Sequence, residues 1–392
     1  MRLIFVPKET RPGETRVAAT PQSVEGLRRL GFEFCVERGA GVASRYLDDA
    51  YERAGATIGS AEDASKADLV LRIQPPSDEE ASRYRSGALV IGQFSPRNDK
   101  AVTETLQAAG VTAFSVDLLP RISRAQSMDV LTSQASLAGY KAVMLGADQL
   151  PKAVPHMSTA AGTIRPSKVI VIGIGVAGLQ AIATARRLGA LVWATDMRPE
   201  TKEQAESLGG KFIEVAAEAA AGSGGYAGTA SESYQAAQKA ALNTHLADAD
   251  LVITSAGNPA APKAPKVLAA DQVGLMKPGS VIVDVTASQG GNCELTKAGE
   301  TVTTDKGVTI IGHENLPATL PQSASFVLAN NLKAVVELFH PRPESGSGTR
   351  SDNRQIDFHD EIIRESVFVH DTKVVNRLVA EAHGLAFEDP QG

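Results

Sequence analysis

Cysteine is scarce in this sequence, which has only Cys35 and Cys293 among its 392 residues. Two cysteines cannot form the disulfide framework of a small secreted domain, and a single bridge is not favoured in a reducing compartment. We therefore expect two buried free thiols. Histidine, cysteine and carboxylate residues also lack the spacing of a metal site, and we interpret the polar run His359-Asp360-Glu361 as solvated surface.

Long apolar runs are also missing. The longest ones, such as residues 169–172, have the length of a strand, whereas about 20 apolar residues are needed to span a bilayer. The N-terminus lacks the apolar core of a secretory signal and leads into a charged segment, so we expect the chain to stay in the cytoplasm. The formal net charge of −6 argues against a nucleic-acid-binding protein, whose surface would need clustered lysine and arginine.

What the sequence does contain is the composition of a soluble globular protein, with 43% hydrophobic and 21% charged residues. A chain of 392 residues suits two domains. Towards the N-terminus, strand candidates alternate with helical patterns such as residues 21–30 and 100–109, as in the βαβ units of a parallel sheet. The strand candidates are residues 3–6, 32–37, 69–73, 89–92 and 112–116.

A second α/β unit follows and is clearer than the first. Its strand candidates are residues 168–173, 191–196, 251–254, 280–284 and 308–312, with a helix over residues 176–188. This alternation is expected of a doubly wound sheet.

Two long helical patterns, residues 129–150 and 323–339, connect the two units, and the second is expected to return the chain to the first domain. Residues 341–354 are interpreted as a flexible excursion, and residues 361–373 are expected to add strands to the first sheet. The sequence thus predicts an α/β protein with two Rossmann-like doubly wound domains joined by two long helices. One domain is formed by residues 1–130 and 322–392, the other by residues 131–321.

The glycine-rich sequence Gly173-Ile174-Gly175-Val176-Ala177-Gly178 lies between a predicted strand and a predicted helix, and has the G-x-G-x-x-G form of a dinucleotide-binding loop. Gly173 permits the tight turn, Gly175 lets the backbone approach a pyrophosphate, and Gly178 allows close packing of helix on strand. The pyrophosphate then lies on free N–H groups at the helix N-terminus. A glycine pattern alone is also compatible with a simple tight turn.

Asp196 supports the dinucleotide interpretation because it ends the next strand, close to the roughly 20-residue separation expected of a ribose ligand. A carboxylate there accepts hydrogen bonds from the ribose hydroxyls and repels a 2′-phosphate, which predicts NAD and not NADP. Arg198 complicates this prediction, since an arginine near that position can hold a 2′-phosphate. We give Asp196 more weight because it lies at the end of the strand.

Further stretches resemble the alanine dehydrogenase and transhydrogenase superfamily. The N-terminal one is Lys8-Glu9-Thr10-Arg11-Pro12-Gly13-Glu14-Thr15-Arg16-Val17-Ala18. A second, Arg121-Ile122-Ser123-Arg124-Ala125-Gln126-Ser127-Met128-Asp129, resembles a loop of the NAD(H)-binding component of transhydrogenases, as do Gly290-Gly291-Asn292-Cys293 and Gly312-His313-Glu314-Asn315-Leu316-Pro317. The resemblance covers nearly the whole chain, and the loop of residues 121–129 is its most specific segment.

The resemblance implies that Arg121, Gln126 and Asp129 surround the nicotinamide end of NAD(H) and are the catalytic residues, with the hydroxyl of Thr132 beside them. A plainer interpretation exists for each. Arg121 could be an ordinary surface cation, and Gln126 and Asp129 could simply cap the long helix, since Asp is a favoured N-cap.

The other contacts implied by the resemblance follow the nucleotide from the pyrophosphate to the adenosine. They are Val176 in the glycine loop, Asp196, Met197 and Arg198 at the ribose, Gly225 and Tyr226 in a mobile loop that closes over the nucleotide, Gln238 just after that loop, and Gly257 through its backbone. Residues 222–228 could instead be a passive glycine linker, and Met197 could serve only in packing. The segment Thr286-Ala287-Ser288-Gln289 lacks the acidic residue that the family often has there.

Two types of enzyme in this superfamily need different residues. An alanine dehydrogenase binds the carboxylate of pyruvate and moves protons, which requires a cationic anchor and a titratable group. The resemblance places the arginine, lysine and histidine of that enzyme at Arg16, Gln74 and Phe94, so the acid–base residues are missing. A transhydrogenase passes hydride directly between two nicotinamides, and the protein need only hold the rings in contact and exclude water.

The resemblance therefore implies the NAD(H)-binding subunit of a proton-translocating transhydrogenase. Only one complete dinucleotide fingerprint is found, so NADP(H) would be bound by a separate component, and transmembrane subunits would carry the protons. This chain would be a homodimer docked peripherally on the cytoplasmic side of the inner membrane. Two alternatives stay open: a soluble NAD-dependent amino-acid dehydrogenase of the alanine or lysine-forming type, and a non-catalytic NAD(H)-sensing module.

Overall fold

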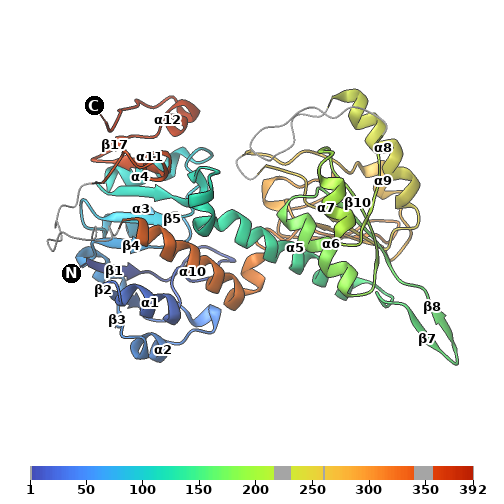
Figure 1. The fold of residues 1–392 in the computed structure, drawn as a ribbon, viewed down its shortest axis with the longest axis horizontal. Helices are drawn as coiled ribbons and strands as arrows, with labels where there is room; N and C mark the ends of the chain where they lie inside the picture. Colours follow the sequence, from blue (N-terminus) through green and yellow to red (C-terminus); the bar gives the residue numbers. More distant parts are fainter. Residues whose placement is uncertain (1, 216–230, 259–260, 340–355, 392) are drawn as a thin grey trace. The chain divides into compact units, whose positions relative to one another are not determined.

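The computed structural model describes residues 2–215, 231–258, 261–339 and 356–391. The chain divides into two compact units, Met1–Ser133 with Pro321–Gly392 (unit 1) and Gln134–Leu320 (unit 2). Each unit contains one mixed, mainly parallel sheet with helices around it (Figure 1). The predicted α/β fold class is therefore confirmed.

Unit 1 is built on an eight-stranded sheet in the order β17-β16-β6-β5-β4-β1-β2-β3. Its strands are β1 (Arg2–Val6), β2 (Phe32–Glu37), β3 (Thr57–Gly59), β4 (Leu69–Leu71), β5 (Leu89–Gly92), β6 (Thr112–Ser115), β16 (Val367–His370) and β17 (Lys373–Val374). Strands β1 to β6 all pair in parallel, whereas β16 is antiparallel to both of its neighbours. The strand order reverses between β1 and β4, as in a doubly wound fold.

Helices cover both faces of the sheet in unit 1. One apolar core contains Leu27 of α1 and Leu332 of α10, and the core on the other face contains Leu106 of α4 and Val379 of α12. The helices of this unit are α1 (Pro21–Arg28), α2 (Asp48–Arg53), α3 (Asp78–Ser82), α4 (Lys100–Ala108), α10 (Pro321–Leu338), α11 (Glu361–Ser366) and α12 (Arg377–His383).

The prediction of strand character over residues 361–373 is wrong for its first half. Residues 361–366 form α11, because the Asp360 carboxylate accepts hydrogen bonds from the backbone N–H groups of Ile362 (2.8 Å) and Ile363 (3.4 Å) and so caps a helix. Both isoleucines are buried. The second half does extend the first sheet, since β16 pairs with β6.

Unit 2 has a seven-stranded sheet in the order β11-β10-β9-β12-β13-β15-β14. Its strands are β9 (Lys168–Ile172), β10 (Leu191–Thr195), β11 (Lys211–Phe212), β12 (Leu251–Thr254), β13 (Val281–Asp284), β14 (Thr301–Thr303) and β15 (Thr309–Ile311). Only the pairing of β14 with β15 is antiparallel among the described strands of this sheet. The other six strands have the 3-2-1-4-5-6 order of a dinucleotide-binding fold.

The helices of unit 2 include α6 (Val176–Arg187), α7 (Thr201–Ser207), α8 (Glu232–Leu246) and α9 (Ala270–Val273). The long helix α5 (Val130–Gln149) passes from unit 1 into unit 2. After it comes a hairpin of β7 (Met157–Thr159) and β8 (Gly162–Ile164). Among the described residues of the chain, we find no helix that combines the length and the apolar character required for a membrane span.

Candidate nucleotide-binding site

The glycine loop joins β9 to α6, and its three glycines are required for different reasons. Gly173 has a φ of +95°, and a Cβ on it would lie 2.5 Å from the backbone nitrogen of Ala256. A Cβ on Gly178 would collide with the carbonyl oxygen of Gly173. Gly175 differs, because a Cβ there would meet no atom within 4 Å. Gly173 and Gly178 thus serve packing, whereas Gly175 leaves open space in front of the backbone.

That open space lies at the N-terminus of α6. Gly175 is the N-cap residue and has no side chain to satisfy the first N–H groups of the helix. Val176, the first helical residue, is 39% exposed. The Ser255 hydroxyl, just after β12, donates to the Gly173 carbonyl (2.9 Å) and fixes the loop from the other side. This geometry suits an anionic pyrophosphate, because free amides and the helix dipole both favour it.

Asp196 lies directly after β10, next to the glycine loop. Its carboxylate accepts a hydrogen bond from the backbone N–H of Ile174 (2.6 Å), which ties the loop to the end of β10. The guanidinium of Arg198 forms an ion pair with the same carboxylate at 3.0 Å. Met197, between them, is partly buried. Asp196 and Arg198, which support different nucleotides in the sequence analysis, are therefore bonded to each other.

Helix α8 adds Tyr234 and Gln238 to this end of the sheet. The Tyr234 hydroxyl donates to the backbone carbonyl of Asp196 (3.3 Å). Burial, together with the charge of Asp196, raises the pKa of Tyr234 to about 12, so the phenol remains a donor. Gln238, one turn further along the helix, is also buried. Sequence reasoning missed Tyr234, although its position one turn before Gln238 places it on the same face of a helix.

Asn292, from the Gly290-Gly291-Asn292-Cys293 stretch, positions the loop after β12. It is fully buried, its side-chain oxygen accepts from the Ala256 N–H (2.9 Å), and its amide donates to the carbonyls of Ala256 (2.7 Å) and Pro265 (2.8 Å). Gly257, the next residue in that loop, is exposed. The resemblance singled out Asn292 without a role, and the structure supplies one. Gly225 and Tyr226, predicted to close over the nucleotide, lie outside the described residues.

The loop of residues 121–129 is in unit 1 and contains a short 3-10 helix, η4 (Ser123–Met128). Asp129 follows it and accepts hydrogen bonds from the N–H (3.0 Å) and the hydroxyl (2.6 Å) of Thr132, so it caps the start of α5. Arg121 donates to the same carboxylate (3.0 Å). Three predicted site residues are thus in contact. Gln126 is exposed, and its side chain makes no hydrogen bond to any described residue.

This loop is held in place by contacts on both sides of Gln126. Asn331 of α10 donates to the Ser127 carbonyl (2.8 Å), and the guanidinium of Arg124 donates to both carboxylate oxygens of Asp360 (2.5 and 2.7 Å). Burial acts to raise the pKa of Asp360, but the hydrogen bonds from Arg124 and from the amides of α11 lower it below its usual value. The loop therefore presents Gln126 from an anchored backbone.

The positions of the arginine, lysine and histidine of an alanine dehydrogenase are occupied here by Arg16, Gln74 and Phe94. Arg16 is buried and donates to Glu14 through Nε (2.8 Å) and Nη2 (2.7 Å), and the Gln74 amide donates to the same carboxylate (2.6 Å). Phe94 is 1% exposed and packs edge-on against Phe368. The Gln74 amide and the Phe94 ring carry no acid or base group that could replace a lysine or a histidine.

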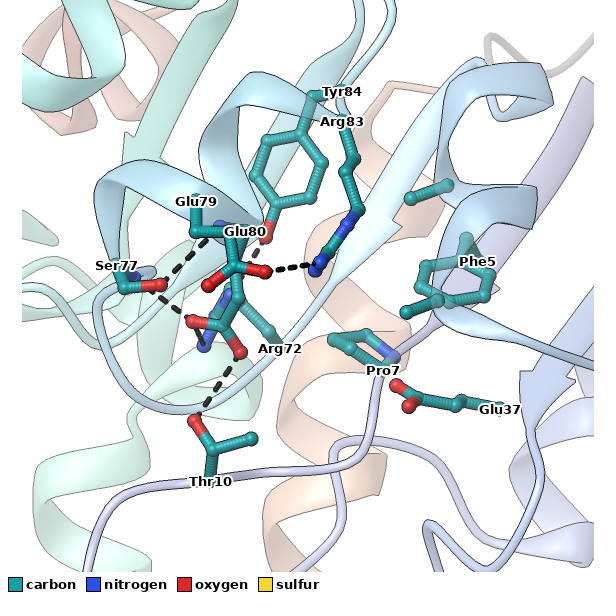
Figure 2. A pocket seen from close by; sticks show the side chains of 12 residues that line it. Phe5, Pro7, Thr10, Glu37, Arg72, Ser77, Glu79, Glu80, Arg83 and Tyr84 are labelled. Carbon is teal, nitrogen blue, oxygen red and sulfur yellow. Dashed lines mark hydrogen bonds and ion pairs between the residues drawn. The ribbon is translucent and has the colours of Figure 1, made fainter.

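A cavity of about 330 Å³ lies in unit 1, at the carboxyl ends of β1 and β4 (Figure 2). Buried Arg72 donates to the Tyr84 hydroxyl (2.6 Å) and lies 3.3 Å from Glu80, which is also bonded to Thr10. Arg83, the other arginine in its lining, pairs with a glutamate of α3. Because both cations are already paired, the cavity is unsuited to a dinucleotide phosphate, and the glycine loop of unit 2 remains the candidate site.

Two family models together match most of the chain. The model of the alanine dehydrogenase/PNT C-terminal domain matches residues 142–377, and that of the N-terminal domain matches residues 5–138.

In sequence identity, this chain is more similar to the transhydrogenases among its relatives than to the alanine dehydrogenases. An NAD(P) transhydrogenase subunit alpha chain of Rhodospirillum rubrum is 48% identical over 339 residues, which is 84% of this chain and 88% of the relative. A solved transhydrogenase structure from Sinorhizobium meliloti has a TM-score of 0.82 and 42% identity, covering 96% of this chain and 99% of that one. A solved L-alanine dehydrogenase has a TM-score of 0.78 at 25% identity, covering 97% and 99%.

Proposed function

We propose that this chain, a member of the alanine dehydrogenase/PNT family and an NAD(P) transhydrogenase alpha subunit, presents NADH to a partner component. Hydride would then pass directly from NADH to the NADP⁺ that the partner holds. The observation that carries this proposal is the glycine loop, where Gly175 opens onto free space at the N-terminus of α6 beside Asp196. The pyrophosphate would bind there, with Asp196, Met197 and Arg198 at the adenosine ribose and Gln238 and Gly257 nearby.

The choice of hydride transfer over amino-acid oxidation rests on the residues at positions 74 and 94. Reductive amination of pyruvate needs an acid–base group within hydrogen-bond reach of the substrate. An amide bonded to Glu14 and a buried phenylalanine cannot supply one. Direct transfer needs none, since the hydride leaves C4 of NADH and bonds to C4 of NADP⁺, giving NAD⁺ and NADPH with no proton gained or lost.

The role of the loop of residues 121–129 is the finer aspect of the proposal. Arg121, Asp129 and Thr132 form one bonded set, and Gln126 stands out from it with an amide that bonds to no described residue. We assign these four residues to the nicotinamide end of the reaction. Amide and ion-pair groups suit a task that consists of aligning two rings, which can account for several orders of magnitude in rate.

The remaining aspects of the proposal concern partners. A second nucleotide needs a second binding component, and proton translocation needs transmembrane subunits, so this chain would act as a peripheral subunit on the cytoplasmic side of the inner membrane. We also propose that it functions as a homodimer. The relatives named as alpha subunits support an assembly with other transhydrogenase subunits.

Two assays decide between the proposed function and its alternatives. In the first, the purified chain with NADH is mixed with an NADP(H)-binding transhydrogenase component and an NADP⁺ analogue, and single-turnover transfer is followed. In the second, the chain alone is given NADH, pyruvate and ammonia. We expect transfer in the first and no reaction in the second. The opposite pattern supports an amino-acid dehydrogenase, and binding with neither reaction supports an NAD(H)-sensing module.

A further inference from the structure

We propose that Arg198 is a phosphate ligand held inactive by Asp196, and that the pair of side chains, not the carboxylate alone, selects NADH over NADPH. This inference rests on the proposed NAD(H) site. It goes further because it assigns selectivity to an interaction between two residues of the chain.

The pairing of the two side chains is well defined. Arg198 donates from Nε to Oδ1 and from Nη2 to Oδ2 of Asp196, both at 3.0 Å, and its backbone N–H donates to Oδ1 at 2.9 Å. Nη2 also donates to the carbonyl of Ile174 (3.0 Å). A planar guanidinium that meets both oxygens of a carboxylate forms the strong, oriented kind of ion pair. The Asp196 side chain is 7% exposed and that of Arg198 20%.

The acceptor sites of Asp196 are filled by this arrangement. With the Ile174 N–H on Oδ2, the carboxylate accepts four hydrogen bonds, which matches the roughly four lone-pair sites it has. A ribose hydroxyl of a bound nucleotide must therefore replace one of these four bonds, and we infer that it replaces a bond from the guanidinium, because the other two donors are backbone N–H groups. The guanidinium would then be released next to the 2′-position of that ribose.

What the released guanidinium meets differs between the two nucleotides. In NADH it meets a neutral 2′-hydroxyl, which can donate to Asp196 in its place. In NADPH it meets a 2′-phosphate, for which an arginine is the preferred partner. The neighbouring carboxylate, however, repels that phosphate and remains the ion-pair partner of the guanidinium. Discrimination is thus a competition between Asp196 and a phosphate for Arg198.

Asp196→Asn isolates this competition. The amide keeps the shape of the side chain and an oxygen that can accept from the Ile174 N–H, but it loses the charge that holds Arg198. We expect the variant to bind NADPH roughly tenfold or more tightly than the wild type does, because a new charge-assisted contact forms. This gain in affinity should decrease steeply with added salt. The affinity for NADH should fall, because the ribose loses a charged acceptor.

Arg198→Gln in both backgrounds shows whether the gain belongs to the arginine. In the Asp196→Asn background it should abolish most of the gain in NADPH affinity. In the wild-type background it should lower the NADPH affinity below that of the wild type, because an uncompensated carboxylate remains. Arg187→Gln removes the same charge from an exposed site near the end of α6 and should change neither affinity. Quenching of the single tryptophan, Trp193 in β10, reports binding of both nucleotides to all five proteins.

The outcomes separate this inference from the proposed function. If the wild-type chain does not bind NADH, the proposed function fails. If it binds NADH, but Asp196→Asn gains the same NADPH affinity with and without Arg198, the carboxylate acts by repulsion alone and the inference is overturned. Should Asp196→Asn not fold, the single Arg198→Gln variant still decides, because unchanged NADPH affinity would contradict a role for Arg198.

Discussion

The carboxylate of Asp129 has two roles, one in capping a helix and one in the proposed site. Its bonds to Thr132 cap α5, and its ion pair holds Arg121 beside them. The capping role and the nucleotide role are therefore compatible, since a carboxylate used as a cap still presents its bonded arginine to a ligand. Gln126 is different: an exposed side chain without a bond to the described residues contributes little to stability.

Gln126→Asn tests the role of that side chain at the residue scale. The substitution keeps the amide and shortens its reach by one methylene, and misplacement on the order of 1 Å can cost roughly 100-fold in an alignment-dependent reaction. We expect hydride transfer in the reconstituted complex to slow greatly while NADH affinity changes little. Stopped-flow transfer and direct NADH titration are the measurements.

The control for this variant is Gln204→Asn, on the exposed side of α7, which should leave both quantities unchanged. Equal losses of binding and transfer in Gln126→Asn would make Gln126 a ground-state binding residue. No change in either quantity would remove residues 121–129 from the proposed site.

At the scale of elements, the turn from β9 to α6 is the segment whose geometry is most constrained. Two of its glycines are packed against backbone atoms, and the third faces open space. Substitution by alanine should therefore impair NADH binding at Gly175 and stability at Gly178, which separates the binding role of the turn from its folding role.

Gly175→Ala should fold with nearly wild-type stability, since surface substitutions usually change it by about 0.5 kcal/mol or less, but NADH affinity should fall by about tenfold or more. Gly178→Ala should instead lower the free energy of unfolding by about 1–3 kcal/mol, because its methyl group collides with the Gly173 carbonyl. Thermal denaturation and the quenching of Trp193 by NADH measure the two effects. Unimpaired NADH binding by Gly175→Ala would place the pyrophosphate elsewhere.

The contact between Arg124 and Asp360 joins residues 121–129 to α11, and it should depend on pH. The folded-state pKa of Asp360 lies below its unfolded value, so its charge stabilises the fold above the unfolded pKa of about 4, and this stabilisation is lost as the pH falls through the lower folded value. The difference in melting temperature between the wild type and Asp360→Asn should be constant near neutral pH and shrink below about pH 4. Exposed Asp305→Asn is the matched control, and a difference that grew in acid would contradict the assigned ion pair.

At the scale of the whole molecule, the elements that could be predicted were those set by local pattern. The apolar runs that became β9 and β12 and the glycines that follow β9 carry their own structural information. Residues 361–366 could not be told from a strand, because Ile362 and Ile363 are as apolar as the strand that follows, and the cap on Asp360 decides. The same limit applies to Asn292, whose bonds reach residues 27 and 36 positions away in the sequence.

The site followed the same rule. Gly175 and Asp196 were predicted from their fixed spacing, and the structure bonds Asp196 to Ile174 of the glycine loop. The pairing of Arg198 with Asp196 was not predicted, because spacing says that two charges are near each other but not which oxygen or nitrogen each one uses. Only the folded structure shows that the carboxylate is already filled.

The central claim, direct hydride transfer between two nucleotides, is tested most directly by isotope transfer. NADH carrying deuterium at both C4 positions is bound to this chain and mixed with NADP⁺ on the partner component in ordinary water. We predict that the NADPH formed contains one deuterium and no hydrogen from the solvent at the new C4 position, with a transfer rate nearly independent of pH because no acid or base takes part. Solvent hydrogen at that position, or NADH oxidation that requires pyruvate and ammonia instead of NADP⁺, would contradict the account.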